Sequence, residues 1–160
     1  MSNDDQEEFY DACEQGELDL IKWFLEEHDV EPTPYKNYAF LLASSKGQLE
    51  VVKFLVTQPG VNPGTCDNRA IRRAACNGHL DVVKFLLTLP GVDPSVDDNF
   101  AIELAAYNGH FDIVLELMHH IQDIPLEAIT PELESLVFKR ACELAGLDLP
   151  AELCWLIGEC

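Results

Sequence analysis

The sequence predicts an all-α solenoid of about five stacked helix-turn-helix repeats, with atypical units capping both ends. Gly16, Gly47, Gly78 and Gly109 stand 31 residues apart in the 160-residue chain. Each glycine opens a near-copy of one apolar segment, as in GQLEVVKFLV and GHLDVVKFLL. Within each copy the apolar residues recur at helical spacing, and a fixed period of this size is typical of repeat architectures.

A single domain, residues 1–160, is expected to hold the whole array. Two units align without a gap, and partial copies precede and follow them. Gly146 follows Gly109 by 37 residues, so the last loop is six residues longer than the others. The predicted repeats cover about residues 8–37, 38–68, 69–99, 100–135 and 136–160.

Each unit contains two predicted helices. In the third unit the first apolar set is Ile71, Ala74 and Ala75, which form one face of a short helix whose small residues allow close helix approach. Gly78 follows and supplies the backbone freedom for a tight turn. The second apolar set has the same helical spacing and consists of Leu80, Val83, Leu86 and Leu87.

The helix ends are marked by polar residues and by proline. An asparagine recurs just before each first helix, where its side chain is predicted to cap free N–H groups: Asn37, Asn68 and Asn99. A carboxylate begins each second helix and complements the positive helix end: Asp19, Glu50, Asp81 and Asp112. The second helices are expected to stop at Pro59-Gly60 and Pro90-Gly91.

This unit, with AxxGHLDVVKFLL at its centre, resembles the ankyrin repeat, closely over residues 8–120 and loosely over 136–158. Two departures stand out. Arg69-Ala70-Ile71-Arg72 replaces the family's Thr-Pro-Leu-His, whose Thr and His link neighbouring repeats by hydrogen bonds. The period is 31 residues where about 33 is usual, so shorter loops are expected.

The resemblance implies a protein that binds another protein through a concave face of loops and first helices. Carrying family positions over gives the candidate binding residues Tyr35, Asn37, Ser45, Lys46, Cys66, Asn68, Arg69, Cys76, Asn77, Asp97, Asn99, Tyr107 and Asn108.

Arg69, Arg72 and Arg73 join this candidate face because they place three of ten basic residues on one helical turn. They could clamp an acidic peptide or a phosphate. The competing interpretation is pairing between repeats, since Glu103 occupies the position of Arg72 one unit along and Asp67 and Asp98 are near in the pattern.

A net charge of −19 disfavours nucleic acid and anionic membranes and favours a basic partner. Two further interpretations stay open: the acidity only keeps an extended solenoid soluble, or the chain is an acidic decoy that sequesters a basic protein. A monomer is expected.

The remaining motifs predict neither catalysis nor a cofactor. No phosphate-binding glycine loop, GxSxG elbow or HExxH motif is present, so no catalytic residue is assigned. His79 and His110 beside the turn glycines, and His119-His120, are interpreted as packing or turn residues, not metal ligands. The six cysteines form no CxxC pair, and the acidic amino terminus is no secretory signal. Free thiols in an intracellular, cytoplasmic setting are predicted.

The carboxyl-terminal stretch LDLPAELCWLIGEC has two interpretations. It resembles the opening helix of an F-box, which would make the chain a substrate receptor for a ubiquitin ligase. Alternatively Pro150 begins a capping helix whose apolar side chains cover the last repeat. Capping is the interpretation adopted here.

Overall fold

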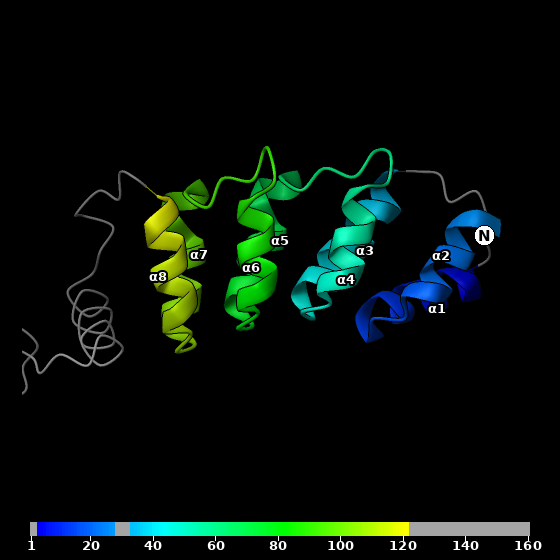
Figure 1. Cartoon of the computed structure of the whole chain (residues 1–160), viewed down its shortest axis with the longest axis horizontal. Coiled ribbons are helices and arrows are strands. Elements are labelled where there is room, and N and C mark those ends of the chain that lie inside the picture. Colours follow the sequence, from blue (N-terminus) through cyan, green and yellow to red (C-terminus); the bar gives the residue numbers. More distant parts are fainter. Residues whose placement is uncertain (1–2, 28–32, 122–160) are drawn as a thin grey trace, which may run out of the picture.

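The computed structural model describes residues 3–27 and 33–121, and this part of the chain contains eight α-helices and no strand. The helices form four antiparallel pairs that stand side by side in a row (Figure 1). In chain order they are α1 (Asn3–Gln15), α2 (Leu18–Glu27), α3 (Thr33–Ser45), α4 (Leu49–Val56), α5 (Thr65–Cys76), α6 (Leu80–Leu87), α7 (Val96–Tyr107) and α8 (Phe111–His120).

The pairs stack in two layers. The first helices α1, α3, α5 and α7 pack each against the next, and the second helices α4, α6 and α8 do the same. Each first helix also contacts the second helix of its own pair. The predicted solenoid is therefore confirmed for four repeats. The fifth repeat and the helix that opens with Pro150 lie outside the described residues.

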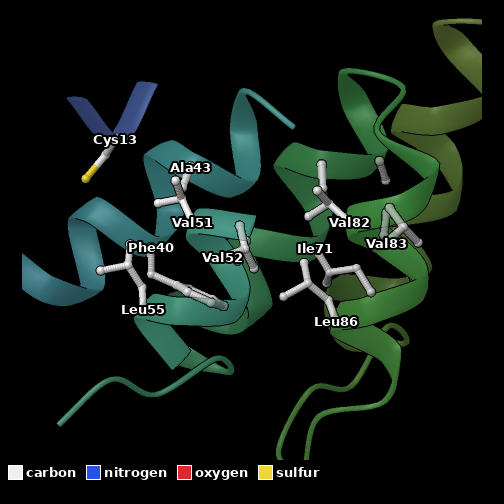
Figure 2. Close-up of a cluster of buried hydrophobic side chains, with 14 of the residues drawn as sticks. Cys13, Phe40, Ala43, Val51, Val52, Leu55, Ile71, Val82, Val83 and Leu86 are labelled. Atoms are coloured by element: carbon white, nitrogen blue, oxygen red, sulfur yellow. The ribbon is translucent and has the colours of Figure 1, made fainter. Parts of the chain in front are cut away.

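The core runs along the stack as a strip with the 31-residue period. In the first helices, Ala43, Ala74 and Ala105 are fully buried, and Phe40, Ile71 and Ile102 lie beside them. Figure 2 shows the strip running from Cys13 through successive repeats to Val83. The second helices add one repeating apolar triplet, with members Val51, Val52 and Leu55; Val82, Val83 and Leu86; and Ile113, Val114 and Leu117.

The glycine turns are left-handed and closely packed. Gly47 has φ +76° and Gly78 has φ +81°, a conformation that glycine adopts without strain. A Cβ atom on Gly47 would lie 2.5 Å from Nδ1 of His79, and one on Gly78 would lie 2.6 Å from Cε1 of His110. The turn glycine of one repeat therefore makes room for the histidine that follows the glycine of the next repeat.

The prediction that the recurring asparagines cap the first helices is wrong. Asn37 lies inside α3, the observed bond of Asn68 Oδ1 runs to another repeat, and Asn99 Oδ1 has no partner among the described residues. Instead, Asn37 Oδ1 accepts a 2.9 Å bond from the N–H of Asn62, and Asn68 Oδ1 accepts the same bond from Asp93. In both cases the asparagine binds the loop of the following repeat, because that loop has backbone donors with no helical partner.

The backbone at the start of α5 differs from that of a regular helix. Cys66, Asp67 and Asn68 all have left-handed backbone angles, with φ of 54°, 55° and 57°. The regular right-handed helix therefore begins at Arg69, as the sequence pattern predicts. Asn68 ends this left-handed turn, and its side chain bonds across the repeat boundary as that of Asn37 does without such a turn.

The other helix-end predictions are confirmed. Asp19, Glu50, Asp81 and Asp112 each lie in the first turn of a second helix. The second helices α4 and α6 end at Val56 and Leu87, three residues before the proline in each case. Polar links between repeats persist although the family's Thr and His are missing, because asparagines and residues beside the turns have taken that role.

Candidate binding face

The exposed side of α3, α5 and α7, here termed the first-helix face, carries large side chains at equivalent positions. Tyr38, Arg69 and Phe100 lie one repeat apart, and Tyr38 and Phe100 are 48% and 41% exposed. Tyr10 on α1 packs edge-on against Tyr38 with ring centroids 4.8 Å apart, and burial raises the pKa of its phenol. Aromatic side chains that are half-exposed and held in place are typical of protein-binding surfaces.

A hollow of about 430 Å³ opens between α3 and α5. Its walls include Tyr38, Phe40 and Leu41 from α3 and Pro63 from the loop that precedes α5. Arg69 stands on the α5 side. The hollow is mostly apolar, so it suits a hydrophobic side chain of a partner.

A second hollow, of about 270 Å³, opens between α5 and α7. It is lined by Arg69, Arg72, Arg73 and Cys76 from α5 and by Phe100 and Leu104 from α7. The guanidinium carbon of Arg72 lies 5.8 Å from the centre of the Phe100 ring, and its Nη2 donates to the carbonyl of Cys66 at 3.4 Å. The arginines therefore face a wall that is partly apolar.

The arginines differ from most described lysines in their partners. Lys22, Lys46, Lys53 and Lys84 each lie within 4 Å of a carboxylate. Arg69 and Arg73 are exposed and have no ion pair or hydrogen bond within the part of the chain that the structure describes. Glu103 likewise pairs with no described residue, so the pairing expected between Glu103 and the arginine cluster does not form.

Several predicted binding residues hold neighbouring repeats together. The side-chain amide of Asn77 donates to the Ser45 carbonyl at 2.7 Å, and His79 Nε2 donates to the same oxygen at 3.0 Å. Lys46 forms a 3.0 Å ion pair with Glu14. Asn108 donates to the Cys76 sulfur at 3.6 Å. Where the first-helix face meets the glycine turns, these polar side chains therefore bond to neighbouring repeats, although they remain partly exposed.

The remaining predicted binding residues differ in how exposed they are. Asn68 and Asn99 are 6% and 5% exposed, so neither offers a surface to a partner. Tyr35 and Cys66 are exposed, and Cys66 lines the α3–α5 hollow. Tyr107 is 90% exposed at the end of α7. The side chain of Asp97 lies outside the described part of the chain.

Tyr38, Leu41, Phe100 and Leu104 line the hollows but were not among the residues predicted from the sequence. The 31-residue register could have found them: Tyr38 and Phe100 align with Arg69, and Leu41 and Leu104 align with Arg72 and Arg73. The first-helix positions carried over from the family lie mainly at the helix ends, whereas the hollows are lined from the middle of each helix.

Chemically reactive groups do not converge on this face. Among the described residues, no three His, Cys, Asp or Glu side chains cluster as metal ligands would. Burial raises the pKa of the Cys13 thiol to about 12, so it is protonated at neutral pH. None of the described helices has the length and apolar composition of a membrane span.

Comparison with known proteins agrees with the repeat geometry. The family model described as ankyrin repeats (3 copies) matches residues 9–98 and 59–128, which is well over half of the chain. Among curated proteins, none matches the chain. Together the matched segments contain all helices from α2 to α8 and the left-handed glycine turns between paired helices. The chain therefore belongs to the ankyrin repeat family.

Proposed function

We propose that this protein is an adaptor that binds a partner protein through the first-helix face and catalyses no reaction of its own. Ankyrin repeats are in general protein-interaction modules. The observation that supports this face is the pair of adjoining hollows, about 430 and 270 Å³, walled by half-exposed Tyr38 and Phe100. An aromatic surface that the described residues leave exposed favours a binding role.

The proposal includes a monomer that works inside the cell. Cys13, Cys66 and Cys76 are free thiols, as expected in a reducing compartment such as the cytoplasm. The F-box interpretation concerns residues 148–158, which lie outside the described part of the chain.

The test is to recover a partner by affinity purification from the source cell and to measure its affinity for face variants. Tyr38→Ala combined with Phe100→Ala should weaken binding on the order of tenfold or more, because buried aromatic anchors dominate interface energies. Trp23→Ala is the matched control, since Trp23 is 49% exposed on α2, in the other layer.

Ionic strength separates the adaptor from an acidic decoy. A decoy that uses the net charge of −19 should lose affinity steeply as salt rises and should ignore the loss of two aromatic rings. An adaptor should show the opposite behaviour. Equal affinity of the aromatic double variant and of Trp23→Ala, with strong salt dependence, would refute the proposal.

A further inference from the structure

Arg69 and Arg73 of α5 stand out because carboxylates are abundant in this chain. There are 29 acidic residues, and four of the described lysines, Lys22, Lys46, Lys53 and Lys84, each lie within 4 Å of a carboxylate. Arg69 and Arg73 have found none within the described residues. They are four residues apart on one helix, so their side chains lie on the same side of α5.

The surroundings of these arginines favour a carboxylate ligand. A guanidinium is a planar fork of donors that matches the two oxygens of a carboxylate. Arg72, between them, already donates to the carbonyl of Cys66 and lies over the Phe100 ring, so the ligand contacts are assigned to Arg69 and Arg73. Phe100 and Leu104 keep water away from one side of the hollow, which strengthens a charge-assisted bond formed there.

The apolar hollow lies directly beside the charged one. Arg69 lines both, with Tyr38 and Leu41 on the α3 side and Arg73 on the α7 side. Packed helices have axes about 10 Å apart. An extended chain advances about 3.3 Å per residue, so side chains that enter neighbouring hollows are about three residues apart.

The charge at the hollows, not the charge of the whole chain, decides which segment docks. Charges farther than about 8 Å are largely screened at physiological ionic strength. Among the carboxylates of α5 and α7 whose side chains the structure describes, Asp67 and Glu103 are exposed and line neither hollow. An acidic segment therefore meets a basic lining in a protein whose overall charge is strongly negative.

We infer that the first-helix face binds an extended segment of a partner protein in which an apolar and an acidic side chain lie about three residues apart. The apolar side chain enters the hollow between α3 and α5, and the carboxylate bonds to Arg69 and Arg73. This inference rests on the proposed function, to which it adds the chemistry of the partner.

The test uses the full chain and a displayed library of short random peptides. Selected peptides should carry an acidic and an apolar residue at the stated separation. For one such peptide, Arg69→Gln combined with Arg73→Gln should weaken binding on the order of tenfold. The matched control is Lys53→Gln combined with Lys84→Gln, which changes the net charge equally at equivalent positions of α4 and α6. The control should change affinity less than about twofold.

A second measurement localises the contact. Replacing the acidic residue of the peptide by its amide should weaken binding to the natural chain but should add nothing in the arginine variant. Peptides without an acidic residue, or an equal loss in the lysine variant, would overturn the inference. If the inference fails in this way but the selected peptides still lose affinity when Tyr38 and Phe100 are replaced, the proposed function survives. If the affinity of the selected peptides changes neither with Tyr38→Ala plus Phe100→Ala nor with Arg69→Gln plus Arg73→Gln, the proposed function fails as well.

Discussion

Asn68 Oδ1 accepts a 2.9 Å hydrogen bond from the backbone N–H of Asp93, which lies 25 residues ahead in the loop of the next repeat. Asn37 makes the same bond to Asn62 at the same separation. In the loop, Asp93 accepts from the N–H and hydroxyl of Ser95, which lowers the pKa of its carboxyl. The asparagine thus anchors a loop that already has internal order.

The first prediction compares Asn68→Ala with Asn99→Ala. Both asparagines are buried and have positive φ, of 57° and 66°, so the backbone strain added by alanine is matched. The side-chain oxygen of Asn68 accepts a hydrogen bond, whereas that of Asn99 has no partner among the described residues. Asn68→Ala should therefore reduce the free energy of unfolding by about 1 kcal/mol more, measured by urea denaturation.

Equal losses for the two variants would contradict this prediction. They would mean that Asn99 has a donor elsewhere in the chain. The same step of 25 residues leads from Asn99 to Ile124, which lies outside the described residues.

The second prediction concerns the packing of the turn glycines. Gly47→Ala and Gly109→Ala both introduce strain at positive φ, of 76° and 78°, at about 1 kcal/mol each. A Cβ on Gly47 also meets the His79 ring, which its bond to Ser45 holds in place, whereas one on Gly109 meets no described atom. Gly47→Ala should therefore cost about 1–3 kcal/mol more in urea unfolding. Similar losses would show that the His79 ring moves aside freely.

The third prediction follows from the raised pKa of Cys13. The folded chain keeps this proton up to about pH 12, whereas the unfolded chain releases it near the ordinary pKa of 9.0. Its contribution to stability is therefore full below pH 9 and is lost as pH rises towards 12. Above pH 9 the slope from this group is roughly −1.4 kcal/mol per pH unit.

Urea unfolding at about pH 8 and about pH 10.5 measures this slope. Cys13→Ala is the control, because Ala75 occupies the equivalent buried position two repeats along. The variant should lose less stability between the two pH values than the natural chain. An identical loss in both proteins would place the titration in other groups.

The fourth prediction concerns the alanines between first helices. Ala74 is fully buried where α5 meets its neighbours, so Ala74→Asp should place an unpaired charge in a close helix contact. We expect a loss of roughly 4 kcal/mol or more, enough to unfold much of the array. Arg73→Asp, at the exposed neighbouring position, should cost less than about 1 kcal/mol. Thermal unfolding followed by circular dichroism compares the stability of the two variants with that of the natural chain.

Sequence periodicity was sufficient to predict the repeats, because each unit buries the same side chains. In the third repeat, for example, the spacing indicates that Ile71, Ala74, Val83 and Leu86 are buried, and all four are. It was insufficient for Asn68, whose type and position fit a helix cap equally well. The pattern within one unit does not show that the partner of this side chain is a backbone N–H of the next repeat.

The candidate face was predicted less completely, for a physical reason. A hollow between helices depends on side chains from two repeats, and a pattern within one unit does not show which ones meet. The arginine cluster was visible because its three members are almost contiguous. Tyr38 and Phe100, 62 residues apart, become neighbours of that cluster only when the repeats stack.

The residues at positions 38, 69 and 100 determine how a bound chain aligns along the row of repeats. The backbone repeats, so a bound chain displaced by one unit would meet nearly the same helix surface. The side chains do not repeat, since tyrosine, arginine and phenylalanine follow one another along the array. A carboxylate moved from Arg69 to either neighbour would exchange a cation for an aromatic ring. A regular scaffold can thus hold a ligand in one alignment and prevent it from slipping.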